Sequence, residues 1–310
     1  MATVATEGLL LLLRLNLVGG AAILLVLLLR PLLRRWFGAH QAYMAWLIAP
    51  VSVIGALIPA PEGSGPVRPL EAEVGRAHDW LQAGDHRWVL VGLWAAGVLV
   101  SVAVTAWRYR RFLEQEVAGR AGPAIVGVVS PRLVTPADFE DRFTPEECRL
   151  VRAHERAHMD RLDARCNAVV LAFQCLNWFN PLLHLAARAI RFDQELACDA
   201  TVMTRLPTER RRYAEALLHS QHGLAATPLG CDWSCPGARR LMTRLTTLME
   251  KRPGESRCEL GDMLLASLWA IVLITAWSAQ PPDRRSRDAH LNIILMPLSL
   301  AEKLNIHPDM

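Results

Sequence analysis

Charge is scarce in this sequence. Only 21% of its 310 residues are Asp, Glu, Lys or Arg, whereas 52% are hydrophobic, and the mean hydropathy is positive at +0.19. A soluble protein of this length ordinarily carries more charge and fewer apolar residues. The composition therefore excludes a typical soluble protein and predicts segments that span a membrane.

Cysteine is absent outside residues 148–258, although that segment holds seven. A reducing compartment tolerates unpaired thiols, whereas an oxidising compartment tends to pair them. The odd count and its confinement to one segment therefore predict that this segment lies in the cytoplasm. Cys231 and Cys235 have a CxxxC spacing, which alone is weak evidence for a metal site, and we interpret them as ordinary thiols.

The sequence also lacks the features of a signal peptide and of a nucleic-acid-binding protein. The leader before the first apolar run has no Lys or Arg and carries Glu7, and no small-residue cleavage site follows the run, which argues against a signal peptide. The net charge is only +4, and the arginine runs at 210–212 and 284–287 are short and lack interleaved aromatic residues. We therefore expect no direct contact with nucleic acid.

Four apolar stretches are each long enough to cross a bilayer, which requires about 20 residues. They cover residues 9–29, 39–60, 88–107 and 260–279. Pro50 and Gly55 interrupt the second stretch, which makes it the weakest of the four. Arg14 lies within the first, and we interpret it as a side chain that reaches back to the membrane surface. The sequence therefore predicts a four-span helical membrane protein in contact with the lipid bilayer.

Arginine clusters after the first and third stretches and before the fourth predict the orientation, because positive residues mark the cytoplasmic side. The N-terminus and the 61–87 loop are expected outside, residues 108–259 in the cytoplasm, and the tail from 280 to 310 outside. The basic RRSR at 284–287 disagrees with an external tail.

The cytoplasmic segment is long enough for one domain with its own core. Two β-branched runs flank a Ser-Pro pair in PAIVGVVSPRLVTP, residues 123–136, and predict a short β-hairpin. Thr144 and Glu147 then form a capping box and Pro145 suits the first helical position, so a helix should begin at Pro145. Asn180 caps a second helix that ends near Pro207. The apolar run between them, residues 167–179, either continues the first helix or packs on the membrane surface.

His154, Glu155 and His158 form an HExxH pattern on the first of these helices. Residues four apart project from adjacent turns of one helix face, so both imidazoles can reach a single ion, and Zn²⁺ favours such nitrogen ligands. In this pattern the glutamate takes a proton from water and does not bind the metal. We therefore predict a zinc site with Glu155 as the catalytic base.

A catalytic zinc needs a third protein ligand. Glu195 on the second helix is the best candidate, with Asp199 one turn further on. We expect Asp199 to orient a ligand histidine through its other ring nitrogen. Cys198 is a rival ligand that projects from a different side of the helix, and a plain acidic surface remains an alternative to any metal role. Tyr213 and His219 are candidates for stabilising an oxyanion.

The segments HERAHMDRLD and WFNPLLHLAARAIRFDQELACDA resemble the M56 family of membrane zinc metallopeptidases, the BlaR1/MecR1-like antibiotic sensors of the bacterial inner membrane. The resemblance covers roughly residues 1–280. It implies a mainly α fold in which a cytoplasmic gluzincin-type protease domain is inserted between the third and fourth spans. It also implies that His154, His158 and Glu195 bind zinc, that Glu155 is the base and that Asp199 supports the site.

The chain departs from the sensors at its end, because residues 280–310 contain no S-x-x-K motif of a penicillin-binding domain. The resemblance implies a regulatory protease that cleaves a cytoplasmic winged-helix repressor or itself, and a homodimer is possible. Two alternatives stay open. One is a quality-control protease similar to the HtpX/Ste24-like family, and the other is a zinc-binding scaffold without turnover.

Overall fold

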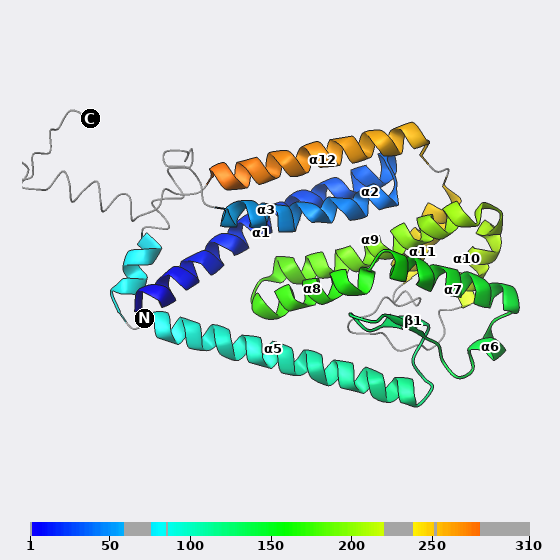
Figure 1. Ribbon diagram of the computed structural model, residues 1–310, viewed down its shortest axis with the longest axis horizontal. Helices are drawn as coiled ribbons and strands as arrows, with labels where there is room; N and C mark the ends of the chain where they lie inside the picture. The colour runs from blue at the N-terminus through cyan, green and yellow to red at the C-terminus, as the bar shows by residue number, and fades with distance from the viewer. Residues whose placement is uncertain (1, 59–75, 85, 220–237, 251–252, 280–310) are drawn as a thin grey trace, which may run out of the picture.

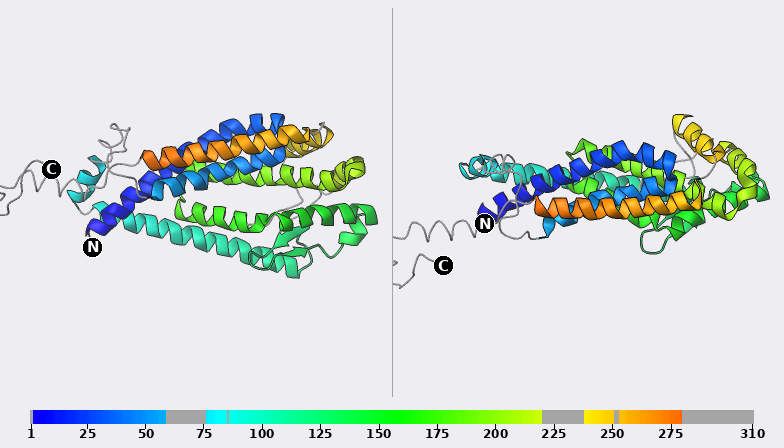
Figure 2. Two further views of the ribbon diagram at one scale, coloured as in Figure 1. Left: turned by 45° about the horizontal axis from the view of Figure 1, so that its top comes forward. Right: turned by 90° about the horizontal axis from the view of Figure 1, so that it is seen from above.

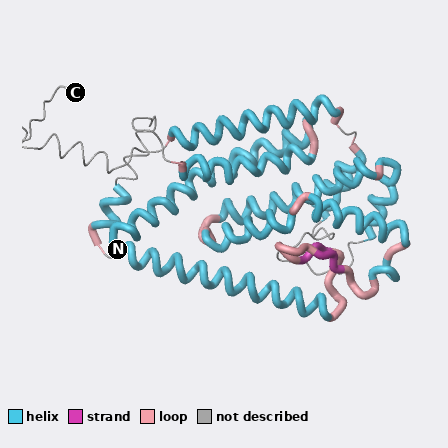
Figure 3. The backbone as a smooth tube through the Cα atoms, viewed as in Figure 1, coloured by secondary structure: helices cyan, strands magenta, loops and turns pink. Residues whose placement is uncertain are grey.

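The computed structural model describes residues 2–58, 76–84, 86–219, 238–250 and 253–279. The described chain is mainly helical, with one two-stranded antiparallel sheet (Figures 1 and 3). Four helical segments are long and apolar enough to cross a membrane. The expected class, a mainly α protein with four apolar spans and a small β element, is confirmed at this level.

Three of the four spans are continuous helices. They are α1 (Ala2–Trp36), α5 (His86–Val117) and α12 (Glu255–Ser278). The first and third extend beyond both predicted limits, and the fourth begins before its predicted start and ends one residue before its predicted end. In each case the polar residues that flank the apolar run remain helical, so that the arginines after the first and third runs lie on the span helices themselves. Apolar content predicts which residues span the membrane, and the helix propensity of the flanking polar residues extends the helix beyond them.

The second span is broken into α2 (Ala39–Met44), the 3₁₀ turn η1 (Ala45–Leu47) and α3 (Ile48–Leu57). Pro50 accounts for the break, because it lacks an N–H group and its ring clashes with the carbonyl one turn earlier. Gly55 was expected to interrupt the second span, but it lies within the helix α3. A Cβ atom there would lie 2.7 Å from the Leu273 carbonyl oxygen, so the absence of a side chain lets α3 pack closely on α12.

The predicted start of the HExxH helix is confirmed. Helix α7 (Pro145–Asp160) begins with the complete capping box, in which the Glu147 N–H donates to Thr144 Oγ1 and the Thr144 N–H donates to Glu147 Oε2. The hairpin is also confirmed, as β1 (Ala124–Val126) paired with β2 (Arg132–Val134). The short helix α6 (Phe139–Arg142) connects the hairpin to α7.

Helix α9 (Pro181–Arg205) begins at the predicted cap, where Asn180 accepts from the Leu182 N–H. It is followed by η2 (Pro207–Glu209), α10 (Arg210–His219) and α11 (Ala238–Met249). Helices α7, α9, α10 and α11 share one apolar core. A second core joins the α1, α2, α9 and α12 helices, so α9 belongs both to the protease-like segment and to the bundle of spans (Figure 2).

The apolar run at 167–179 does not continue α7, so that expectation is wrong. The chain turns after α7 through Leu162, whose φ of +59° is left-handed, and starts a new helix, α8 (Asp163–Leu176). Helix α8 packs beside α9 as a helical hairpin between α5 and the other spans (Figure 1).

The tip of the α8–α9 hairpin is bonded to two span helices. Asn16 of α1 donates to Asn177 Oδ1 at 2.7 Å and accepts from Asn180 Nδ2 at 2.8 Å. The Trp94 indole N–H of α5 donates to the Leu176 carbonyl oxygen at 2.9 Å. Both contacts fall inside apolar span helices, so part of the segment expected to be wholly cytoplasmic lies alongside the spans.

Gly97 gives a direct test of this arrangement. The Trp178 indole packs on Gly97 so closely that a Cβ atom there would overlap the ring. We expect Gly97→Ala to lower the stability of the purified protein by about 1–3 kcal/mol, as overpacking commonly does, measured as a lower melting temperature. Gly92→Ala on the same helix, which has open space around it, is the control and should not lower the melting temperature. Equal behaviour of the two variants would contradict the packing described.

Three sequence predictions lie wholly or mostly outside the described residues. They are the form of the 61–87 loop up to residue 75, the nature of Cys231 and Cys235, and the tail from residue 280 onward. Residues 76–82 within that loop are helical.

Candidate metal centre

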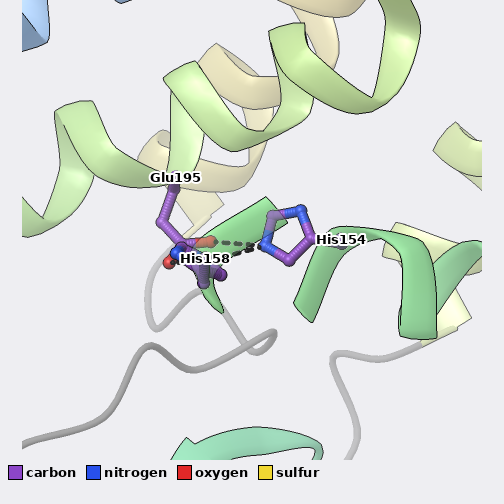
Figure 4. Close-up of side chains that lie close together, drawn as sticks. All are labelled: His154, His158 and Glu195. Atoms are coloured by element: carbon purple, nitrogen blue, oxygen red, sulfur yellow. Dashed lines mark hydrogen bonds and ion pairs between the residues drawn. The ribbon is translucent and has the colours of Figure 1, made fainter. Parts of the chain in front are cut away.

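Three side chains from two helices converge on one point (Figure 4). His154 Nε2 and His158 Nε2, both on α7, lie 3.0 Å apart. Glu195 of α9 brings one carboxylate oxygen to 3.3 Å from His154 Nε2 and the other to 3.4 Å from His158 Nε2. Both histidines are fully buried, and the glutamate side chain is 13% exposed. The structure thus brings together the three residues that the sequence predicts as metal ligands.

The other ring nitrogen of each histidine is held by an oxygen acceptor. His154 Nδ1 lies 2.7 Å from Tyr213 Oη and 3.3 Å from Asp199 Oδ1, and His158 Nδ1 lies 2.9 Å from Asp163 Oδ2. Tyr213 donates its own proton to Asp199, so its oxygen is left to accept from His154. These partners favour the tautomers with hydrogen on Nδ1, which leave both Nε2 lone pairs pointing at the common centre.

That centre fits a metal ion. Two imidazole lone pairs and a carboxylate would repel one another at about 3 Å unless a cation lay between them. Zinc bonds of about 2.0–2.1 Å in tetrahedral geometry place neighbouring ligand atoms about 3.3 Å apart, and the three separations here are 3.0, 3.3 and 3.4 Å. Imidazole nitrogen and carboxylate oxygen are also ligands that zinc accepts.

Glu155 follows the first ligand histidine and is fully buried. Among the described residues, neither of its carboxylate oxygens has a hydrogen-bond partner. Burial raises the pKa of Glu155 to about 7, despite the opposing influence of the two histidines. A buried carboxyl that titrates near neutrality and lacks a protein partner is suited to exchange protons with water or substrate.

Arg244 of α11 neutralises the acidic pair on α9. Its guanidinium is fully buried, donates to both oxygens of Asp199 at 2.7 and 2.8 Å, and lies 3.0 Å from Glu195 Oε2. Burial alone would raise the pKa of Asp199, but Arg244 and His154 together outweigh burial and hold that pKa at about 2. The pKa of Glu195 is likewise held well below its usual range, against burial, by Arg244 and the histidines. Both carboxylates are therefore ionised, as a metal ligand and its support require.

Cys198 lies away from the three ligand atoms. Its sulfur is 3.2 Å from His158 Nδ1 and 3.4 Å from Asp163 Oδ2, on the opposite side of the imidazole from Nε2. Burial raises the pKa of this thiol to about 12, so it stays protonated. Cys198, His158 and Asp163 form a second cluster of possible ligands, but Asp163 is already bonded to Arg161.

Neither candidate for oxyanion stabilisation faces the convergence point, and both expectations are corrected. Tyr213 is fully buried behind His154, between Nδ1 and Asp199. His219 is 64% exposed and pairs with Glu147 at 2.7 Å, at the opposite end of α7 from His158. Each side chain is occupied by a structural contact.

Comparison with known proteins now decides the family. Residues 117–248 match the family model described as "BlaR1 peptidase M56". This segment belongs to the M56 peptidase family. The match includes His154, Glu155, His158, Glu195 and Arg244. M56 proteins are metallopeptidases, so the converging ligands lie within a domain whose family uses a metal.

Two kinds of relative support the M56 assignment. "Regulatory protein BlaR1" of Bacillus licheniformis is 27% identical over 125 residues, which are 39% of this chain and 21% of the relative. "Methicillin resistance mecR1 protein" of Staphylococcus aureus and Staphylococcus epidermidis is 29% identical over 97 residues, which are 31% of this chain and 17% of the relative. The matches thus span about a fifth of these relatives. With the four apolar helices, they identify a membrane protein.

Two residues that support the candidate metal centre, Asp163 and Arg244, were not predicted from the sequence. Asp163 ends the motif HERAHMDRLD, but only the left-handed turn at Leu162 directs it back to His158. Arg244 left a clearer signal. It lies among Leu241, Leu245 and Leu248 at helical spacing, and a charged residue within an apolar stripe indicates a buried ion pair.

Polar contacts join the span helices to the candidate metal centre. Tyr43 of α2 donates to Asp163 Oδ1 at 3.1 Å, and Asp163 in turn holds His158. Arg30 of α1 and the Trp46 indole of η1 both bond to Asp193 Oδ2, at 3.1 and 2.8 Å. Asp193 precedes the third ligand by two residues on α9, so spans one and two are tied directly to the helices that carry the ligands.

Metal-free protein should lose stability as pH rises, because of Glu155. Its pKa is about 7 in the fold, against an ordinary value of 4.5, so the folded state holds a proton that the unfolded state has released between these pH values. Relative to Glu155→Gln, wild type should therefore lose about 3 kcal/mol between pH 4.5 and pH 8. Melting curves in a chelator at several pH values would measure this.

The control for this pH effect is Glu146→Gln, an exposed position in the first turn of the same helix. Its melting curve should follow wild type at every pH. Parallel pH profiles for wild type and Glu155→Gln would contradict a buried carboxyl at position 155.

Proposed function

We propose that the chain is an integral-membrane zinc metalloendopeptidase that acts as a signal-transducing regulatory protease. The observation that carries this proposal is the convergence of His154, His158 and Glu195 on one point beside the buried Glu155. Zinc is the metal proposed, because two imidazoles and one carboxylate form a typical catalytic zinc set with a position left for water.

The residues have distinct parts in peptide hydrolysis. Zinc, when bound, supplies a Lewis acid that polarises the scissile carbonyl and makes water nucleophilic near neutral pH. Glu155 accepts the proton of the attacking water and delivers it to the leaving amine. Asp163 and Asp199 hold the ligand histidines in the correct tautomer, and Arg244 keeps Glu195 ionised. The oxyanion stabiliser is unassigned, because both candidates are occupied elsewhere.

The contacts between spans and metal centre favour a regulatory role. Tyr43 and Asp193 join the first two spans to the ligand helices, and Arg244 lies on α11, which leads into the fourth span. A displacement of the second span would move Asp163, which is bonded to His158, or Asp193, which lies two residues before Glu195. The name "Regulatory protein" of one relative agrees with such coupling. A cytoplasmic winged-helix repressor, the chain itself, or both are the proposed substrates.

The proposed location is the bacterial inner membrane, with both termini outside and the metal centre at the cytoplasmic side. The arginines that follow the first and third apolar runs and precede the fourth support this orientation. A homodimer is the proposed assembly.

Reconstitution of the purified protein with two kinds of substrate tests the role. Vesicles containing wild type would be incubated with the product of a neighbouring repressor gene and, separately, with an unfolded membrane protein. A single defined cut in the repressor or in the chain supports the regulatory role. Progressive degradation of the unfolded protein alone would favour quality control, and zinc binding without any cleavage would favour a scaffold.

A further inference from the structure

A groove of about 710 Å³ lies between α5, α8 and α9, away from the convergence point of the metal ligands. Its volume is in the usual range for sites that hold small molecules, about 300–1,000 Å³. One stripe of each helix faces it. The lining residues used below are Val104, Arg108 and Arg111 of α5, Leu171 of α8, and Arg188 and Arg191 of α9.

The charge of this lining is strongly one-sided. It contains four arginines, two from α5 and two from α9, and no carboxylate. Arg108, Arg111 and Arg188 are exposed, and among the described residues none of these three is paired with Asp or Glu. Arg191 lies one turn of α9 before Glu195. The like charges of Arg108, Arg111 and Arg188 repel one another, and an anion bound among them would reduce that repulsion.

The groove lies across the end of an apolar span. The apolar run of α5 ends at Trp107, which is 56% exposed, and arginines follow it. At its upper end Thr105 contacts Cys175 at 3.8 Å, and the α8–α9 tip contacts Trp94 further up the same helix. Toward the tip the lining combines the apolar Val104 and Leu171 with uncharged polar side chains such as Gln174, and beyond Trp107 it is basic. An exposed tryptophan followed by arginines is typical of the membrane–water interface.

We propose that this groove binds one anionic phospholipid of the cytoplasmic leaflet. The arginines hold the phosphate, for which guanidinium groups provide paired donors, and Val104 and Leu171 contact the first part of an acyl chain. Basic pockets between helices at the cytoplasmic side recognise anionic head groups in this way. The proposal requires a membrane protein of this orientation but not peptidase activity.

Native mass spectrometry of the full chain tests the proposal. The Glu155→Gln background prevents self-cleavage, and the probes are phosphatidylglycerol and phosphatidylcholine. We expect one phosphatidylglycerol per chain, bound at least tenfold more tightly than phosphatidylcholine. Arg108→Gln with Arg188→Gln should reduce the affinity for phosphatidylglycerol at least tenfold. The control, Arg35→Gln with Arg110→Gln, removes the same charge from exposed positions outside the groove and should change the affinity less than threefold.

Equal binding of the two lipids by the parent protein would overturn the proposal, whatever the variants do. An equal loss in both double variants would also overturn it, because it would show general attraction to basic residues. A co-purified peptide displaced by the groove variant would assign the groove to a peptide instead. Arg108→Lys with Arg188→Lys keeps the charge but not the paired donors, so it should bind phosphatidylglycerol more tightly than the double Gln variant and less tightly than the parent. This result separates loss of binding from loss of fold.

Discussion

Glu155→Gln is expected to reduce peptide cleavage by about 10³-fold while the protein still binds one zinc ion. Glutamine preserves the size of the side chain but cannot accept the water proton. The three ligand side chains keep their partners, because Glu155 has no hydrogen bond to any of them. Metal analysis and an immunoblot of fragments from the same membranes would measure both quantities.

Two further variants make this result specific. Glu146→Gln, on the exposed first turn of the same helix, should cleave as wild type does. His154→Gln should lose both zinc and cleavage, because it removes a ligand. Unchanged cleavage by Glu155→Gln would contradict the proposed base, and loss of zinc from that variant would give the residue a structural part instead.

Arg244→Met is expected to destabilise metal-free protein by about 3–5 kcal/mol. The substitution keeps much of the apolar volume but leaves Asp199 and Glu195 without their cation in a buried site. Removal of one partner from a buried ion pair is costly because the remaining charge loses its compensation. Melting temperatures of wild type and variant in a chelator would show the difference.

Zinc should reverse part of this loss. A divalent cation beside Glu195 replaces the charge of the missing guanidinium, so zinc should raise the melting temperature of Arg244→Met more than that of wild type. Arg239→Met, an exposed position on the same helix, is the control and should melt as wild type does with and without zinc. An Arg244→Met variant as stable as Arg239→Met without metal would contradict the buried network.

Local signals in the sequence predicted much of the fold. The span positions follow from apolar length, the start of α7 follows from its capping box, and the start of α9 follows from Asn180 and Pro181. The HExxH spacing also predicted that two imidazoles share one helix face. These features depend on neighbours in the chain, which a sequence displays directly.

Features that depend on distant parts of the chain could not be predicted in the same way. The apolar sequence of α8 is compatible with a longer α7 or with a segment on the membrane surface, and its position beside α1 and α5 depends on contacts with distant residues. Tyr43 supports the metal centre from 120 residues away, through Asp163. Arg244 was recognisable as a charge in an apolar stripe, but its partners on α9 were not.

X-ray absorption at the zinc edge of the purified, metal-loaded protein tests the central claim most directly. The account predicts one zinc per chain with nitrogen and oxygen neighbours only, at about 2.0–2.1 Å, including two imidazoles. Loss of one imidazole from the spectrum of His158→Gln would identify that ligand. A sulfur neighbour at about 2.3 Å would place the metal at Cys198 instead, and protein without zinc would contradict the metal centre altogether.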